Sequence, residues 1–199
     1  MTVIRCRASG GVFPHDNIEI PDELVKEILS SVLEVPDSLF ISADKRSPFS
    51  FHKQSSGGYL LVCSSWHRVG APFLYETVVL RSKGQMQALE RTLNEHPDLV
   101  RYIKKIRIEG GHCDSEYMIL ESAKNLTDLC LSFELLETDD IEDLWEGLAV
   151  VQPRRVILPQ WISRHKDSRR LELRLCELIP RWQNLVRTFT CIGIEHPRA

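Results

Sequence analysis

A few side chains in this sequence have the chemistry to bind a metal ion or to support a reaction. His112 and Cys113 are adjacent and could both ligate zinc, but no second pair lies at zinc-finger spacing. The seven histidines are scattered, as expected for surface or hydrogen-bonded residues rather than for a catalytic group. Phosphate-binding, dinucleotide-binding, nucleophile-elbow, HExxH and EF-hand motifs do not occur. We therefore expect no enzyme activity, no catalytic residue, no metal and no cofactor.

Two clusters of charged residues could recognise a charged partner. Acidic residues gather from Glu134 to Glu146, around the start of an expected helix, where negative charge suits the helix dipole. Basic residues gather from Arg164 to Arg174 and could bind an acidic or phosphorylated partner. The simpler interpretation of both clusters is a solvated loop or helix face. An enzyme with an unrecognised pocket would instead need a buried, strongly perturbed carboxylate or histidine in a cleft.

The composition is that of an ordinary globular protein. Of the 199 residues, 43% are hydrophobic and 27% are charged, and the formal net charge of −3 gives no reason to expect nucleic acid or an anionic membrane as a partner. No apolar run approaches the ~18 residues of a membrane span, and the N-terminus lacks the apolar core of a secretory signal. The six cysteines are spread singly, which favours free thiols in a reducing compartment. We expect a cytoplasmic or nuclear protein.

The stretch from Ile20 to Leu29 predicts an amphipathic helix over residues 21–34. Pro21 suits the first turn because its missing N–H is not needed there, and acidic residues follow it at the positive end of the helix dipole. Leu24 and Ile28 begin a broad apolar stripe at helical spacing. A stripe of this width is more than one short helix can cover, which indicates a binding surface.

A second helix is expected over residues 59–69, followed by a break at Gly70-Ala71-Pro72 and a short third helix. Residues 36–58 between the first two helices are rich in Ser, Lys, Pro and Gly. We expect this segment to be an exposed loop, longer than compact domains usually contain. Aromatic and aliphatic residues such as Phe40 could hold parts of it against the surface.

From Thr77 onward, short β-branched runs alternate with amphipathic helical segments. Five expected strands are centred on Val78, Ile106, Leu129, Val156 and Thr188, at intervals of 28, 23, 27 and 32 residues. The first three intervals match the range of about 20–29 residues typical of leucine-rich repeats, in which parallel strands line one side and helices the other. The repeat core LxxLxL is present at Leu126, Leu129 and Leu131. A generic α/β domain with parallel strands would give the same periodicity.

Residues of the expected N-terminal helices resemble a motif of a known family. The patterns Ile20-Pro21-x-Glu23-Leu24-x-x-x-Ile28-Leu29 and Leu61-Val62-Cys63-x-x-Trp66-x-x-Val69-x-x-Pro72-x-Leu74-Tyr75 resemble the F-box. More narrowly, the chain is similar to F-box-like proteins whose helices are followed by leucine-rich repeats. The long segment over residues 36–58 departs from the usual connection in that family.

The resemblance implies a substrate-receptor subunit of an SCF-type cullin–RING ubiquitin ligase. In that family the F-box docks on a Skp-type adaptor, and through it on the cullin scaffold, while the repeats bind a protein substrate. Trp66 would face either the adaptor or the core of the module. The adaptor-binding residues implied by position are Ile20, Pro21, Leu24, Val25, Ile28 and Leu29 in the first segment and Leu61, Val62, Cys63 and Trp66 in the second.

The expected fold class is α/β, with three parts. Residues 1–17 form a flexible tail, residues 18–75 an F-box-like helical module with the inserted loop 36–58, and residues 76–199 a short leucine-rich-repeat-like β/α solenoid with parallel strands. About five strands is short for such a solenoid, so we expect a shortened family member or part of a longer protein. The alternative function is a repeat-type interaction module unconnected with ubiquitin.

Overall fold

The computed structural model of the chain describes residues 20–44, 47–51, 56–132, 141–159 and 166–190. The expected tail 1–17 therefore lies outside the described residues. So do residues 134–140 of the acidic cluster and Arg164 and His165 of the basic cluster.

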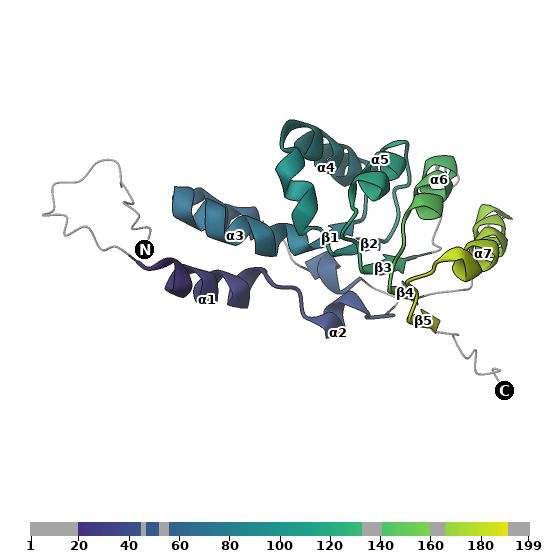
Figure 1. The fold of residues 1–199 in the computed structure, drawn as a ribbon, viewed down its shortest axis with the longest axis horizontal. Coiled ribbons are helices and arrows are strands. Elements are labelled where there is room, and N and C mark those ends of the chain that lie inside the picture. The colour runs from purple at the N-terminus through teal and green to yellow at the C-terminus, as the bar shows by residue number, and fades with distance from the viewer. Residues whose placement is uncertain (1–19, 45–46, 52–55, 133–140, 160–165, 191–199) are drawn as a thin grey trace, which may run out of the picture.

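The centre of the fold is a five-stranded parallel sheet whose strands lie side by side in chain order (Figure 1). All five predicted strand centres share one row across the sheet, because Val78 pairs with Ile106, Ile106 with Leu129, Leu129 with Val156 and Val156 with Thr188. The predicted α/β class is thus confirmed. The strands are β1 (Thr77–Leu80), β2 (Lys105–Ile108), β3 (Asp128–Leu131), β4 (Arg155–Leu158) and β5 (Arg187–Thr190).

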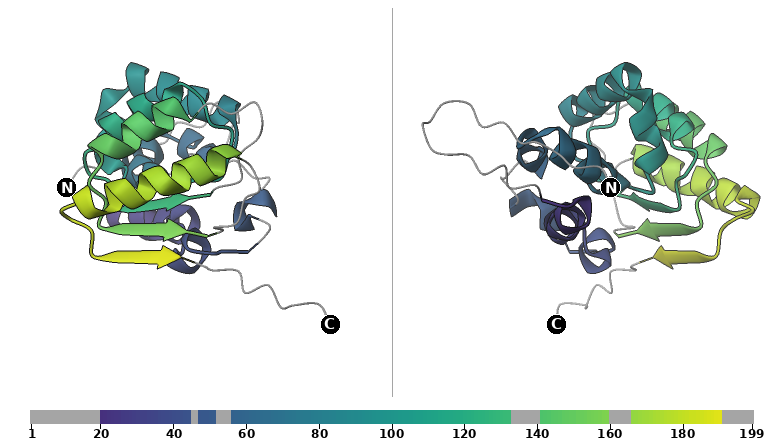
Figure 2. Two further views of the ribbon diagram at one scale, coloured as in Figure 1. Left: turned by 90° about the vertical axis from the view of Figure 1, so that its right-hand side faces the viewer. Right: turned by 60° about the vertical axis from the view of Figure 1, so that its left-hand side comes forward.

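Four helices connect consecutive strands and cover one face of this sheet (Figure 2). Their apolar sides and the apolar row of each strand form the main core, which includes the fully buried Met86, Ile106, Leu129 and Leu144. A serine side chain helps to begin the first of them, since the hydroxyl of Ser82 accepts a hydrogen bond from a backbone N–H. These helices are α4 (Lys83–Glu95), α5 (Ser115–Ser122), α6 (Glu142–Val150) and α7 (Lys166–Leu178), accompanied by the 3₁₀ helices η3 (Pro97–Tyr102) and η4 (Ile179–Arg181).

The N-terminal part is a separate helical module beside β1, with its own small core. The predicted first helix is confirmed as α1 (Asp22–Leu33), which packs against α3 (Ser64–Glu76) and against the 3₁₀ helix η2 (Ser56–Leu61). The buried members of this core are Val25, Leu29, Leu33, Leu60 and Ala71.

The predicted break at Gly70-Ala71-Pro72 is wrong, because α3 runs through all three residues. Gly70 is there for packing: a Cβ at this position would lie 2.3 Å from Cδ2 of Leu60 and 2.9 Å from Cδ1 of Leu29. Pro72 sits inside the helix, where it removes one backbone hydrogen bond. Glycine at position 70 therefore lets Leu60 and Leu29 pack closely against α3, and this glycine reflects packing and not a turn.

The expectation of an exposed loop over residues 36–58 is also wrong in part. Within it lie α2 (Asp37–Phe40) and η1 (Pro48–Phe51), and α2 lies on the face of the sheet opposite α4–α7 (Figure 2). Phe40 is fully buried there in a cluster with Cys130 and Ile157. The alternation of strand residues explains this, because Cys130 and Ile157 point away from the main core and leave an apolar area that Phe40 covers.

Candidate functional site

The most distinctive surface of the protein is an apolar stripe along α1. Ile20, Leu24, Ile28 and Val32 recur every four residues and are 39%, 52%, 45% and 44% exposed. The adjacent side of the same helix is buried, because Val25, Leu29 and Leu33, one position after Leu24, Ile28 and Val32, lie in the core of the module. The broad apolar face of this helix is therefore only partly covered by its own module.

The end of η2 and the residue after it add two further exposed apolar side chains. Leu61 is 85% exposed and Val62 is 58% exposed, whereas the preceding Leu60 is buried against α1 and α3. Because η2 packs against α1, these side chains belong to the same helical module as the stripe. We use the name apolar surface for Ile20, Leu24, Ile28, Val32, Leu61 and Val62.

The structure divides the ten predicted adaptor-binding residues into three groups. Val25 and Leu29 are fully buried, so they belong to the core of the module and not to a docking surface. Cys63 and Trp66 are half-buried, and Trp66 packs against that core. The exposed residues are Ile20, Pro21, Leu24, Ile28, Leu61 and Val62. Sequence periodicity alone could not separate the buried from the exposed residues, because the two adjacent rows of side chains on α1 are both apolar.

Ionic contacts fasten the helical module internally. Asp22, in the first turn of α1, accepts hydrogen bonds from the Ser65 hydroxyl at 3.0 Å and from the Arg68 guanidinium at 2.6 Å, both on α3. The Arg68 contact lowers the pKa of the Asp22 carboxyl below its usual value. Asp22 therefore links the first turn of α1 to the first turns of α3.

A second set of polar contacts fastens α2 to the sheet. The Asp37 carboxylate accepts hydrogen bonds from Arg155 on β4 at 2.5 and 2.7 Å and pairs with Lys105 on β2 at 3.3 Å. Arg155 also pairs with Asp128 on β3. Hydrogen bonding from Arg155 lowers the pKa of Asp37 to about 2. The carboxylate therefore stays charged across the physiological range.

The buried Arg107 of β2 completes this attachment. Its guanidinium donates to the carbonyl oxygens of Phe40 at 2.6 Å and Ser42 at 3.0 Å, and it pairs with Glu109 at 2.5 Å. A buried guanidinium requires such partners, because an unpaired buried charge is strongly destabilising. The segment that joins α1 to η1 is thus held on the open face of the sheet by both apolar and charged contacts.

The adjacent His112 and Cys113 of the sequence make separate contacts in the structure. His112 is fully buried and its Nδ1 lies 2.7 Å from the Glu116 carboxylate, while Cys113 lies 3.8 Å from the Met86 sulfur. Across the described residues, no three His, Cys, Asp or Glu side chains are placed to hold a metal ion. Burial raises the pKa of the Cys130 thiol to about 12, which leaves it uncharged and unreactive.

Within the described residues, no helix has the length and apolar character needed to cross a membrane. Comparisons of the chain with protein families, with curated proteins and with solved structures found no match. The feature of this chain that bears most on its function is therefore the apolar surface of the helical module.

Proposed function

We propose that this chain is a substrate-receptor subunit of an SCF-type cullin–RING ubiquitin ligase and is not itself an enzyme. The apolar surface of its helical module would dock on a Skp-type adaptor and through it on the cullin scaffold. The β/α units would bind a protein substrate and hold it near the ubiquitin-conjugating enzyme. Catalysis would then be an effect of proximity, with no covalent step on this chain.

The observation that supports this proposal most is the exposed stripe on α1. An amphipathic helix that lays its apolar side chains into a partner's groove is a common mode of recognition, with anchors at i, i+3 or i+4, and i+7. Leu24 and Ile28 have the i, i+4 spacing, and Val32 continues it by one further turn. The stripe is also exposed in the isolated chain, which supports a docking helix over a merely structural cap.

The attachment of α2 to the sheet gives the proposal a mechanical basis. A receptor works by proximity only if its docking module and its substrate-binding part keep a defined geometry. The contacts of Asp37 and Arg107 join the segment after α1 directly to β2 and β4. Because this segment covers part of the open face of the sheet, we assign substrate contact to the remaining surface of the β/α units and to the covering segment itself.

Co-expression with a Skp-type adaptor tests the proposal. The wild-type chain should co-purify with the adaptor, and the double variant Leu24→Asp/Ile28→Asp should not, because two carboxylates would be desolvated in the interface. Both positions are exposed, so the variant should fold normally, which circular dichroism would verify.

The matched control is Glu23→Ala/Glu27→Ala, which alters two exposed residues of the same helix outside the stripe. It should keep adaptor binding. Equal recovery of the adaptor with wild type and with the Leu24→Asp/Ile28→Asp variant would contradict the proposal. It would favour the alternative of an interaction module unconnected with ubiquitin.

A further inference from the structure

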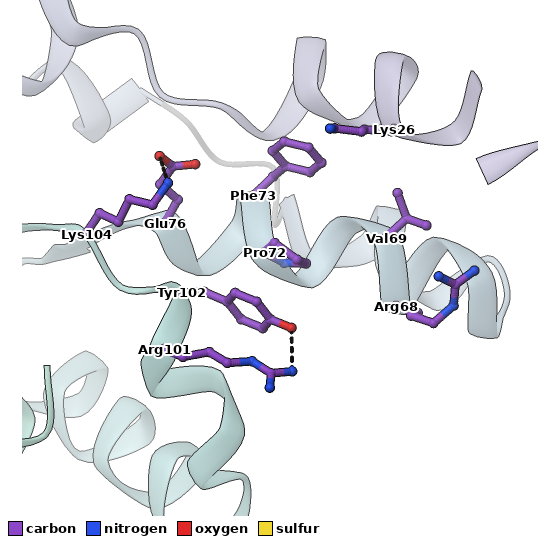
Figure 3. A pocket seen from close by; sticks show the side chains of 9 residues that line it. All are labelled: Lys26, Arg68, Val69, Pro72, Phe73, Glu76, Arg101, Tyr102 and Lys104. Atoms are coloured by element: carbon purple, nitrogen blue, oxygen red, sulfur yellow. Dashed lines mark hydrogen bonds and ion pairs between the residues drawn. The ribbon is translucent and has the colours of Figure 1, made fainter. Parts of the chain in front are cut away.

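A second surface of the helical module has a different chemistry from the apolar surface. A pocket of about 390 Å³ lies along α3, between Lys26 of α1 and the end of η3 (Figure 3). Its floor is formed by Val69, Pro72 and Phe73, which are half-buried side chains of α3. We call this pocket the basic groove, for the reason given next.

Positive charge predominates around the basic groove. It is lined by four cationic side chains and a single carboxylate, that of Glu76, which is paired with Lys104 at 3.1 Å. The chain as a whole has a formal net charge of −3, so this concentration of cations is not a reflection of overall composition. The four cations are Lys26, Arg68, Arg101 and Lys104.

Two of these cations are available to a ligand. Arg68 is held by Asp22 and Lys104 by Glu76, but in the part of the chain that the structure describes neither Lys26 nor Arg101 has an ion-pair partner. The guanidinium of Arg101 donates to the neutral Tyr102 hydroxyl at 2.8 Å and lies 4.8 Å from the centre of that ring (Figure 3). This contact orients the guanidinium without neutralising it.

We propose that the basic groove binds an acidic peptide segment of a protein partner. Carboxylates of the peptide would pair with Lys26 and Arg101, while an apolar side chain would lie on Val69, Pro72 and Phe73. A simple anion would use the cations alone, whereas this groove combines them with an apolar floor, which suits a ligand that alternates negative and apolar side chains.

The basic groove is distinct from the apolar surface, so this inference does not depend on adaptor docking. Lys26 follows Leu24 by two positions, which places the two side chains about 200° apart around α1. The remaining lining residues belong to α3 or to the η3 region and are not part of the apolar surface. Both surfaces could therefore be occupied at the same time.

Fluorescence anisotropy with a labelled peptide of alternating glutamate and leucine tests the proposal. Wild type should bind this peptide, and Lys26→Glu/Arg101→Glu should weaken binding by about tenfold or more, because two attractions become repulsions. Both residues are exposed, so the variant should fold. The charge-matched control Arg81→Glu/Arg181→Glu changes exposed cations outside the groove and should leave the affinity unchanged.

Two further arms define what would overturn the proposal. A peptide of alternating glutamine and leucine should bind at least about tenfold more weakly, as charge pairing is lost. Equal binding of the two peptides, equal binding by wild type and the groove variant, or no binding of the acidic peptide would contradict it. Pyrophosphate that displaces the labelled peptide at the same concentration as the unlabelled peptide does would also contradict the proposal, because it would indicate a plain anion site. The variant Lys26→Glu/Arg101→Glu should still co-purify with the Skp-type adaptor. Loss of peptide binding can therefore be told apart from a loss of adaptor docking.

Discussion

The helical module and the β/α units differ in how much of their apolar surface they bury. Among the described residues, twenty-four buried apolar residues form the core of the β/α units, whereas five form the core of the helical module. Of the large apolar side chains that the structure describes as exposed, eight lie between Ile20 and Val62 and three lie beyond residue 76. The β/α units thus satisfy their own apolar surface, while the module leaves much of its apolar surface uncovered.

This difference indicates which part depends on a partner. Small modules bury a small fraction of their surface and are marginally stable alone. Uncovered apolar side chains in such a module are a disadvantage unless another protein covers them. We propose that the β/α units supply the stability and that the module attached to them supplies the docking surface. The following predictions test this division.

Shortening a core leucine in each region should produce the largest effects and should separate the two regions. Leu129→Ala and Leu29→Ala both truncate fully buried side chains and should each cost about 2–5 kcal/mol. Hydrogen exchange should then rise across the strands in Leu129→Ala, but only in α1–α3 in Leu29→Ala. Faster exchange of the strands in Leu29→Ala would show that the two regions unfold as one unit.

Replacing a helical glycine by alanine should have opposite signs in the two regions. Gly70→Ala in α3 should destabilise by about 1–3 kcal/mol, because its Cβ would meet Leu60 and Leu29. Gly84→Ala in α4 meets no atom within 4 Å and should stabilise by up to about 1 kcal/mol through helix propensity. Urea unfolding of both variants measures the contrast, and a stabilising Gly70→Ala would refute the close packing of α1, η2 and α3.

Removing the charge of Asp37 should weaken the connection between the module and the sheet by about 1 kcal/mol or less, since the carboxylate is partly exposed and screened. The pKa of the Asp37 carboxyl is about 2 in the folded protein, whereas it is 3.8 for an aspartate without these partners. The contribution is therefore present above pH 4 and is lost as the pH falls toward 2. Wild type should be more stable than Asp37→Asn at pH 7, and the two should converge near pH 2. An equal difference at both pH values would contradict this assignment.

The smallest effect on stability should come from the most exposed residues. Leu61→Ser/Val62→Ser removes no buried contact and should change the free energy of unfolding by no more than about 0.5 kcal/mol. The same variant should measurably weaken adaptor binding in a titration by calorimetry. A variant that is clearly destabilised, or that binds the adaptor like wild type, would remove these residues from the apolar surface.

The strand pattern was readable from the sequence because each strand has its own local signal. The five predicted centres form one continuous row in the sheet, and helices alternate with the strands as expected. The signals of α3 were misleading, because Gly70 and Pro72 usually mark a turn. Here Gly70 is required by the approach of Leu60, which lies ten residues earlier and cannot be recognised from local spacing.

The candidate surfaces were only partly predictable for the same reason. The positions of the exposed stripe follow from helical periodicity, but its separation from the buried Val25 and Leu29 depends on where α3 packs. The basic groove brings Lys26 together with Arg101, residues with no relation in the sequence. The attachment of α2 likewise depends on Arg107 and Arg155, which in a strand pattern resemble ordinary surface residues.

Size-exclusion chromatography of the chain with and without a co-expressed Skp-type adaptor would decide whether the helical module docks on that adaptor. We expect a soluble one-to-one complex, poor solubility of the chain alone, and loss of the complex in Leu24→Asp/Ile28→Asp. A well-behaved monomer that does not bind the adaptor would contradict it, because the apolar surface of the helical module would then need no partner of this kind.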